Sequence, residues 1–318
     1  MITTPTDKPT LLLDAPALGP LKVMLEANYE VIALWEQTDM AAFLAGAGQR
    51  VRVILGGGEK IDTALVEGLP NLGLIARIGS GYEAVDVPHA RARGVLVSNT
   101  PGVNAEDVAD HALALLLAVE RGVVNGDARV RSGGWTRADR GPPWRSLKGL
   151  KVGVVGLGDI GLAVAERLVA FKCDIRWWGP RPKPGVAFTR TDSLTGLAKW
   201  ADSLILCARA DASNEKMVGA PVLDALGPYG SLVNITRGSL VDEAALIAHL
   251  KGGKLAGAGL DVFEEEPTPA ARWEGVPGLV LTPHIGGNTR GAIPAMIGLA
   301  MANVQAFLAG EPLPTPVP

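Results

Sequence analysis

The segment Lys151–Gly161 constrains the fold of this chain more than any other stretch of its sequence. It begins with an apolar run that predicts a buried strand. Gly156, Gly158 and Gly161 follow in the spacing Gly-x-Gly-x-x-Gly, and Leu162–Ala170 continues with helical periodicity. Between a strand and a helix, the first glycine permits a tight turn, the second lets the backbone approach a pyrophosphate, and the third lets the helix pack on the strand. The sequence therefore predicts an α/β unit that binds a dinucleotide.

The amino-terminal end of the predicted helix is the expected site of the pyrophosphate. Free backbone N–H groups and the helix dipole both favour negative charge there. Asp159 and Ile160, which lie between the second and third glycines, are assigned to the same cofactor site.

The position that usually distinguishes NAD from NADP lacks an acidic residue. NAD-binding units commonly carry Asp or Glu about 20 residues after the glycines. Here the predicted strand Asp174–Trp178 ends in Gly179, and Arg181 and Lys183 follow in a proline-rich turn. Cations at this point attract the 2′-phosphate that a carboxylate would repel, and arginine does so through a forked donor. The sequence predicts a preference for NADP(H) over NAD(H); the alternative is that both cations are solvated surface residues.

Composition limits the classes of partner. The chain has 318 residues and a formal net charge of −3, which argues against a nucleic acid as its main partner. No apolar run reaches membrane-spanning length, and Met1–Pro9 shows no signal pattern. Cys173 and Cys207 lack metal-type or redox spacing and predict buried free thiols in a reducing compartment. We expect a soluble cytoplasmic protein without a metal cofactor.

The alternation of apolar runs with helical patterns predicts two Rossmann-like or flavodoxin-like α/β domains with parallel sheets. The first, residues 1–100 with 288–318, contains no dinucleotide fingerprint and is assigned to substrate binding. The second, residues 101–287, is assigned to the dinucleotide, with an active-site cleft expected between the domains. A long helix over Asn104–Gly122 is expected to join them, and a helix over Arg290–Leu308 is expected to return to the first domain. Four prolines in Glu311–Pro318 predict an extended tail.

Three side chains with catalytic potential follow predicted strands of the second domain. Arg237 follows Leu232–Ile235, Glu266 comes shortly after a strand that ends near Val262, and His284 follows Leu279–Thr282. Because ligands of parallel α/β sheets bind at the carboxyl ends of the strands, these residues are expected to converge on one crevice. The structural alternatives are that His284 is a polar cap, that Arg237 pairs with a carboxylate such as Asp242, and that the acidic run ending at Glu266 is solvated.

The motifs of the chain resemble, in order and over nearly its whole length, those of the D-isomer-specific 2-hydroxyacid dehydrogenase family. Besides the glycine fingerprint, the matching segments are Gly79–Gly81, Asn99–Gly102, Asn234–Gly238, Leu260–Pro267 and Pro283–Gly287. Within the family, Arg181 and the segment with Trp135 and Trp144 look like the NADP-linked glyoxylate and hydroxypyruvate reductases. The family is commonly dimeric, so the resemblance implies a homodimer. Whether the two tryptophans cross the dimer interface or pack under a loop stays open.

The resemblance implies a role for each site residue. Arg237 would bind the 2-oxoacid through its carboxylate and carbonyl oxygens. His284 would donate the proton to the carbonyl oxygen, and Glu266 would hydrogen-bond the imidazole and keep it protonated for reduction. A forked guanidinium suits an anionic substrate, and a histidine paired with a carboxylate suits proton transfer near neutral pH.

Three further residues are assigned by the same resemblance. Asp261 would hold the nicotinamide carboxamide, with bracing of the strand end as its alternative. Ser80 and Gly81 would offer backbone N–H groups to the substrate carboxylate, with a simple turn as the alternative for Ser80.

The activity implied is NADPH-dependent reduction of a small 2-oxoacid, of the glyoxylate or hydroxypyruvate type, to the D-2-hydroxyacid. One alternative is NAD-dependent oxidation of a D-2-hydroxyacid, as in phosphoglycerate dehydrogenases. The other is a dinucleotide-sensing module without turnover, like the corepressors that resemble this family.

Overall fold

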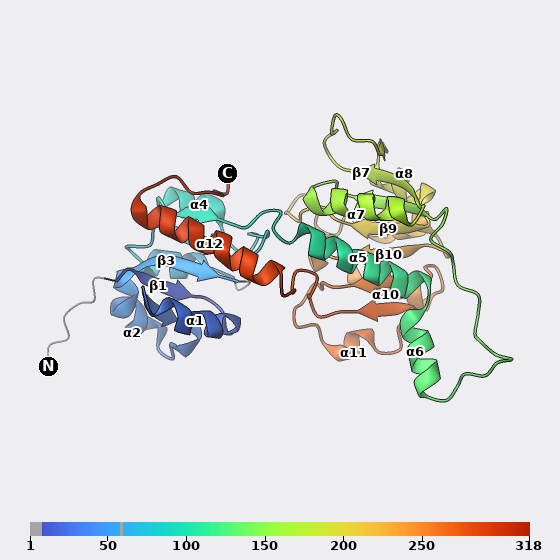
Figure 1. Ribbon diagram of the computed structural model, residues 1–318, viewed down its shortest axis with the longest axis horizontal. Coiled ribbons are helices and arrows are strands. Elements are labelled where there is room, and N and C mark those ends of the chain that lie inside the picture. Colours follow the sequence, from blue (N-terminus) through green and yellow to red (C-terminus); the bar gives the residue numbers. More distant parts are fainter. Residues whose placement is uncertain (1–7, 58–59) are drawn as a thin grey trace. The chain divides into compact units, whose positions relative to one another are not determined.

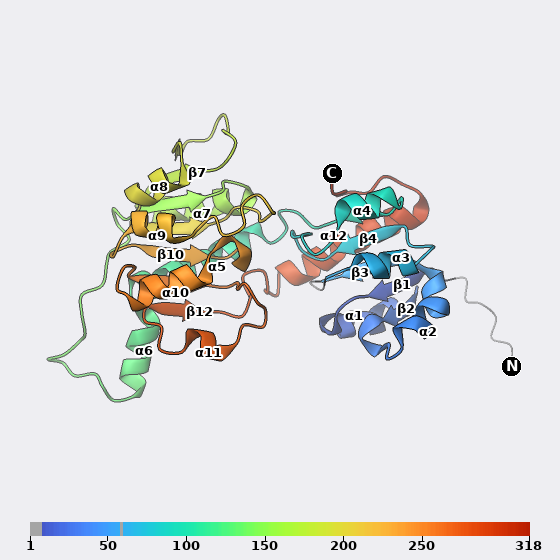
Figure 2. The same ribbon diagram turned by 180° about the vertical axis from the view of Figure 1, so that it is seen from behind.

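The computed structural model describes residues 8–57 and 60–318, in two compact α/β units. Of the segment Met1–Pro9, for which the sequence predicts no signal pattern, residues 1–7 lie outside the described residues. One unit spans the chain up to Asn104 together with Arg290–Pro318, and the other is Ala105–Thr289 (Figure 1, Figure 2).

The first unit contains a five-stranded parallel sheet in the order β2-β1-β3-β4-β5. This is the flavodoxin-like order, as the alternating pattern predicts. β1 and β4 are buried along their whole length because helices cover both faces of the sheet. The strands are β1 (Thr10–Leu13), β2 (Glu30–Ala33), β3 (Val51–Gly56), β4 (Leu74–Arg77) and β5 (Leu96–Ser98).

Two apolar clusters attach helices to the two faces of this sheet. On one face, Leu12 and Ile54 pack with residues of the helices α2 (Met40–Ala45), α3 (Thr63–Gly68) and α4 (Val87–Ala92). On the other face, Leu11 and Leu13 pack with α1 (Gly19–Leu25) and α12 (Ala292–Ala309). Each of α2, α3 and α4 begins after an aspartate whose side chain accepts a backbone N–H of the first turn. Three short 3₁₀ helices complete the unit: η1 (Pro16–Leu18), η2 (Leu34–Glu36) and η3 (Ala47–Arg50).

The helix α12 is both long and apolar, contrary to the expectation that no apolar run reaches membrane-spanning length. By length and composition alone its 18 residues pass the test for a membrane-crossing helix. Core helices of soluble proteins pass the same test, and here Ala300 and Val304 are buried against the sheet. Packing on the sheet accounts for this buried part of α12.

The carboxyl-terminal tail is extended, as its prolines predict, but it is also fixed to the sheet. Val317 N donates to Val97 O at 2.8 Å, and Thr315 Oγ1 donates to Asn99 O at 2.6 Å. The buried Asn303 of α12 binds Thr315 from the other side, through its carboxamide. The tail thus pairs along β5 in an antiparallel sense.

The second unit contains a seven-stranded parallel sheet in the order β12-β11-β10-β9-β6-β7-β8. Counted from β6, this is the doubly wound order of dinucleotide-binding domains with one added strand, so the predicted fold class is confirmed. The order reverses between β6 and β9, and the glycine segment follows β6. The strands are β6 (Lys151–Val155), β7 (Asp174–Trp178), β8 (Thr189–Arg190), β9 (Ser203–Leu206), β10 (Ser231–Asn234), β11 (Gly257–Leu260) and β12 (Leu279–Leu281).

Helices cover both faces of this sheet as well (Figure 1). On one face, α5 (Ala105–Glu120) and α7 (Asp159–Ala170) pack on Val152, Val154 and Ile205. On the other face lie α8 (Leu194–Trp200), α9 (Ala220–Leu226) and α10 (Glu243–Lys251), with Leu204 and Leu232 beneath them. The alternation of faces along β9 and β10 follows from the two-residue period of a strand. The short helices η4 (Gly238–Leu240) and α11 (Ala270–Trp273) lie in the loops after β10 and β11.

Among the elements of this unit that were not predicted from the sequence are α6 and β8. The helix expected over Asn104–Gly122 ends at Glu120, and a separate helix, α6 (Val123–Arg131), follows with no buried residue. β8 contains only two residues, too few to show a strand pattern. After α6 the chain forms a long arm that extends away from the sheet (Figure 2).

Candidate active site

The three glycines after β6 have the geometry that the fingerprint requires. Gly156 has φ +88°, a conformation that favours glycine, and it makes the turn at the end of the strand. A Cβ on Gly161 would lie 2.1 Å from Gly156 O, so only glycine allows α7 to pack this closely. A Cβ on Gly158 would meet nothing within 4 Å, so the backbone there faces open space. Asp159 and Ile160 form the first turn of α7, whose amino-terminal N–H groups border this space. These residues fit a dinucleotide pyrophosphate.

The turn after β7 brings together three cations, of which the sequence indicated two. Arg181 and Lys183 are exposed, and Lys183 Nζ donates to Leu157 O at 2.5 Å, so this amine is tied to the glycine loop. Arg190 on β8 donates to Gly179 O through Nε at 3.2 Å and Nη2 at 2.8 Å. Sequence reasoning missed Arg190 because no local pattern shows that β8 pairs beside β7. Its guanidinium holds the turn in which Arg181 lies.

The loop after β10 carries Arg237 and is folded by an asparagine side chain. Asn234 Oδ1 accepts from Thr236 N at 3.1 Å and from Thr236 Oγ1 at 2.9 Å, while Asn234 Nδ2 donates to Arg237 O at 2.9 Å. Arg237 Nη1 donates to Thr236 O at 2.6 Å. Asn234 is buried at the end of its strand, so these bonds fix the backbone from which the guanidinium projects.

The loops after β11 and β12 bring Glu266 and His284 together. His284 Nδ1 lies 2.7 Å from Glu266 Oε2, and Glu266 Oε1 accepts from Phe263 N at 3.0 Å. Of the three consecutive glutamates, Glu266 is the one that contacts the imidazole, as the family pattern predicts. Because Nδ1 is bound to the carboxylate, Nε2 is the ring atom that can serve a substrate.

Electrostatics keep Glu266 ionised. Burial raises the pKa of this carboxyl, but hydrogen bonds from His284 and Phe263 N, with the charges of His284 and Arg237, lower it below its ordinary value overall. Arg237 is thus close enough to act on the Glu266 charge. Arg237, Glu266 and His284 lie in the loops after β10, β11 and β12, which are neighbouring strands of the sheet, although 29 and 18 residues separate them in sequence.

Asp261 braces the backbone that presents His284. Its side chain is only 1% exposed, and its carboxylate accepts from Thr282 Oγ1 at 2.6 Å, Ile285 N at 2.9 Å and Gly286 N at 2.8 Å. Its carbonyl oxygen accepts from His284 N at 2.8 Å. His284 has φ +53°, an uncommon conformation for a histidine, and these bonds hold it there. The described contacts thus correspond to the bracing alternative, and the contact with a nicotinamide carboxamide stays a prediction.

A second histidine joins this brace. His111 on α5 lies with Nε2 2.9 Å from Thr282 Oγ1 and 3.2 Å from Asp261 Oδ1. Sequence reasoning does not identify His111, because nothing local connects position 111 with position 282. Burial raises the pKa of Asp261, but the hydrogen bonds from His111, Thr282 and the two backbone N–H groups lower it overall.

Ser80 and Gly81 lie in the other unit, in the loop after β4. Ser80 Oγ donates to Thr100 O at 3.3 Å and to Asn104 Oδ1 at 3.1 Å, and Ser80 O accepts from Asn99 Nδ2 at 2.7 Å. The hydroxyl and carbonyl of Ser80 are therefore used to shape the loop. Binding of a substrate by the backbone of Ser80 and Gly81 stays a prediction.

The second unit thus offers a dinucleotide cradle, a guanidinium for an anion, and an imidazole oriented by an ionised carboxylate. A histidine whose Nδ1 is held by a glutamate can give a proton from Nε2 and take it back. Such a set suits proton transfer to a carbonyl oxygen during hydride transfer from a cofactor.

Comparisons with known proteins agree with this chemistry. Residues 113–286 match the family model described as D-isomer specific 2-hydroxyacid dehydrogenase, NAD binding domain. Hydroxyphenylpyruvate reductase of Plectranthus scutellarioides is 37% identical over 308 residues, which cover 96% of this chain and 98% of that protein.

Two solved structures have the same fold over nearly the whole chain. A 2-hydroxyacid dehydrogenase from Ketogulonicigenium vulgare has a TM-score of 0.90 at 41% identity, covering 98% of this chain and 99% of that one. The NADPH-dependent glyoxylate/hydroxypyruvate reductase of Sinorhizobium meliloti, in complex with NADP and malonate, has a TM-score of 0.90 at 38% identity, covering 98% and 97%.

Proposed function

Because the chain belongs to the D-isomer-specific 2-hydroxyacid dehydrogenases and is therefore a nicotinamide-dependent oxidoreductase, we propose that it uses NADPH to reduce a small 2-oxoacid to the D-2-hydroxyacid. Glyoxylate and hydroxypyruvate are the expected substrates. The observation that carries the proposal is the pair His284 Nδ1–Glu266 Oε2 at 2.7 Å, with the charge of Arg237 acting on Glu266. The resemblance to a glyoxylate/hydroxypyruvate reductase over 98% of the chain supports the choice of substrate.

The residues of the chain divide the reaction between them. The bound nicotinamide supplies the hydride that arrives at C2 of the substrate. Arg237 binds the substrate carboxylate and carbonyl oxygen through its forked guanidinium and so orients C2. His284 gives a proton from Nε2 to the carbonyl oxygen, and the ionised Glu266 stabilises the imidazolium before that transfer. Asp261 holds the His284 backbone through its carbonyl and carboxylate oxygens.

The preference for NADPH rests on the turn after β7. No carboxylate occupies Gly179–Lys183, and Arg181 is exposed in a turn that Arg190 fixes. An exposed guanidinium on a turn that is bound to the glycine loop suits a 2′-phosphate. Lys183 adds positive charge to the same turn, although its amine is bound to Leu157 O.

The proposal extends to assembly and location. α6 and the arm after it expose Val123, Val130, Trp135 and Trp144 at 43–60% of their surface, which is unusual for a monomer and supports a homodimer through this segment. A cytoplasmic location is supported by Cys173 and Cys207, which form no disulfide. Burial raises the pKa of the Cys173 thiol to about 11 and raises that of Cys207 further, so both thiols stay protonated at neutral pH.

Initial rates with each cofactor test the proposed function. The wild type and the variant Arg181→Asp are compared for oxidation of NADPH and NADH with glyoxylate and hydroxypyruvate. We expect kcat/KM for NADPH to fall by about 10- to 100-fold in the variant, since losing a charge-assisted contact costs about 1.5–3 kcal/mol, while NADH turnover is kept. Lys254→Asp, an exposed site on the same unit, controls for the change in net charge.

The outcomes separate the alternatives. Tight NADPH binding without turnover of any 2-oxoacid contradicts the reductase and favours a sensing module. A clear preference of the wild type for NADH refutes the cofactor assignment and favours NAD-dependent oxidation.

A further inference from the structure

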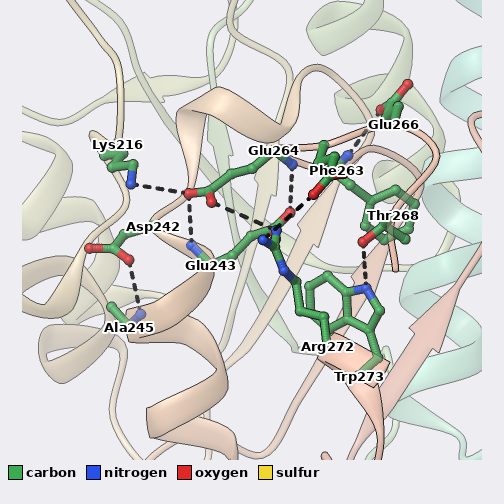
Figure 3. A network of polar contacts seen from close by, with 11 residues as sticks. Lys216, Asp242, Glu243, Ala245, Phe263, Glu264, Glu266, Thr268, Arg272 and Trp273 are labelled. Carbon is green, nitrogen blue, oxygen red and sulfur yellow. Dashed lines mark hydrogen bonds and ion pairs between the residues drawn. The ribbon is translucent and has the colours of Figure 1, made fainter. Parts of the chain in front are cut away.

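Glu243, at the start of α10, is a buried acid that none of the roles above uses. Its side chain is 4% exposed. A buried carboxylate is costly unless it is paired and hydrogen-bonded. Glu243 Oε1 accepts from Glu264 N at 2.6 Å, and Glu243 Oε2 pairs with Arg272 Nη1 at 2.5 Å (Figure 3). The carboxylate therefore connects α10, the loop after β11, and α11.

The side chain of Glu264 ties the same two segments together in the opposite direction. Glu264 Oε1 accepts from Glu243 N at 3.3 Å and pairs with Lys216 Nζ at 3.3 Å. Figure 3 shows Glu264 between Lys216 and Glu243. Arg272 also lies 3.9 Å from Glu264 and 4.0 Å from the exposed Glu265, so the two cations Lys216 and Arg272 lie among three carboxylates.

The loop after β10 is locked to this point by close packing of backbone. A Cβ on Gly238 would lie 1.8 Å from the carbonyl carbon of Phe263 and 2.2 Å from Glu264 N. Gly238 directly follows Arg237, so the peptide held by Glu243 is also the one on which the Arg237 loop rests. A shift of that peptide would move both loops.

The Phe263–Glu264 peptide is separated from Glu266, the partner of His284, by a single residue in the sequence, Glu265. Phe263 N donates to Glu266 Oε1 at 3.0 Å, and Glu266 Oε2 contacts His284 Nδ1 at 2.7 Å. The Phe263 ring packs on Trp273, with centroids 5.6 Å apart, and Trp273 adjoins Arg272 in α11. The backbone that orients Glu266 is thus held by the Glu243 carboxylate and by the packing of the Phe263 ring on Trp273.

We propose that Glu243 is a positioning residue for the reaction: its buried carboxylate fixes the Phe263–Glu264 backbone, and thereby the orientation of Glu266 toward His284. The inference rests on the proposed roles of Glu266 and His284. Glu243 itself touches neither of them and acts through the loop.

A matched pair of variants tests the proposal. Glu243→Gln removes the charge and keeps the shape. Glu120→Gln does the same to a second acid of this unit, 2% exposed, which binds Arg145 Nε and Nη2 at 2.7 Å and Ser231 Oγ at 2.5 Å. Ser231 is the first residue of β10, whereas Arg237 comes after the last residue of that strand. Glu120 therefore lies at the amino-terminal end of β10, and Arg237 lies beyond its carboxyl-terminal end. Both variants lose a buried Arg–Glu pair, but only Glu243→Gln loosens the Glu266 loop.

We expect the two variants to lose similar thermal stability and to differ in catalysis. In Glu243→Gln, kcat falls by about 10- to 100-fold because the pair is misplaced, while the Kd of NADPH changes by less than about twofold. The groups that act on Glu266 are His284, Arg237 and Phe263 N, and weaker contact with them lets the pKa of Glu266 rise. The acid limb of the kcat/KM profile then moves to higher pH. Glu120→Gln keeps the wild-type kcat and pH profile.

A readout without turnover separates this inference from the proposed function. In protein labelled with ¹³C-glutamate, the Glu266 carboxyl signal, assigned through Glu266→Gln, is followed against pH. A higher titration midpoint in Glu243→Gln than in the wild type and Glu120→Gln supports the positioning role even if no 2-oxoacid is reduced. Equal titration curves and equal kcat in the two variants overturn it. If Glu243→Gln does not fold, Arg272→Gln removes the guanidinium that binds Glu243. The kcat and the titration midpoint of Glu266 are then measured in this variant, and we expect both to change in the same direction but by less.

Discussion

The replacement Asp261→Asn tests how much of the His284 backbone depends on one buried carboxylate. Both oxygens of Asp261 accept hydrogen bonds, from Thr282 Oγ1, Ile285 N and Gly286 N, with His111 Nε2 at 3.2 Å. An amide of the same shape keeps one acceptor and turns the other oxygen into a donor. At least one N–H of the loop then faces an N–H.

The expected cost follows from the number of bonds lost. A hydrogen bond to a charged acceptor contributes about 1.5–3 kcal/mol, and a buried donor left unsatisfied costs about 1–3 kcal/mol. Because the site is 1% exposed, water cannot replace the lost acceptor. We expect Asp261→Asn to lower the free energy of unfolding by about 2–4 kcal/mol at neutral pH.

The pH dependence of this difference has a definite sign. The pKa of Asp261 in the folded state lies below its ordinary value. A carboxyl with a lowered pKa stabilises the fold fully above its unfolded pKa of about 3.9, and this contribution is lost as the pH falls through the folded pKa. The difference between wild type and Asp261→Asn is therefore constant from about pH 8 to 5 and shrinks below about pH 4.

Urea unfolding followed by tryptophan fluorescence measures this difference. Six of the seven tryptophans lie in the unit that contains Asp261, Trp35 being the exception. Asp224→Asn is the matched control: Asp224 lies 3.1 Å from His249 Nε2 but is 63% exposed, so its loss should cost less than about 0.5 kcal/mol. A cost below about 1 kcal/mol for Asp261→Asn, or a difference that does not shrink in acid, refutes the bracing role.

Three further predictions follow from the same structure. Gly158→Ala should leave the melting temperature unchanged and weaken NADPH binding at least about tenfold in a fluorescence titration, because the added Cβ meets no protein atom within 4 Å and extends toward the ligand. Gly161→Ala should instead prevent stable folding, because its Cβ would collide with Gly156 O. The reverse order of effects would contradict the cradle. Arg190→Met should raise the KM for NADPH about three- to tenfold and leave the KM for NADH unchanged, since it releases the turn after β7. Equal effects on both KM values would show that this turn does not discriminate between the two cofactors. Val130→Glu, at a side chain 60% exposed on α6, should convert the proposed dimer to monomer in sedimentation experiments, and an unchanged mass would exclude α6 from the interface.

Local patterns in the sequence determined the fold class and the places where the chemistry is found. Alternating apolar and helical segments predicted two parallel α/β sheets, and the predicted strands near Leu11, Val51 and Val152 are present. The glycine spacing predicted a tight turn at Gly156, an accessible backbone at Gly158 and a close helix–strand contact at Gly161, and the structure has all three. These features depend on residues a few positions apart, so a single segment contains the information.

The tertiary structure decided which side chains meet. Glu266, rather than Glu264 or Glu265, contacts His284, because Glu264 is bound to Glu243 and Lys216. His111 and Arg190 take part in the site through contacts with residues far away in the sequence. α6 has no buried residue, so the sequence shows no apolar face from which this helix could be predicted. Sequence patterns record which residues are near in the chain and which face is apolar. They do not record the packing of one loop against another, and in this protein that packing sets the hydrogen-bond partners and the charges around the catalytic pair.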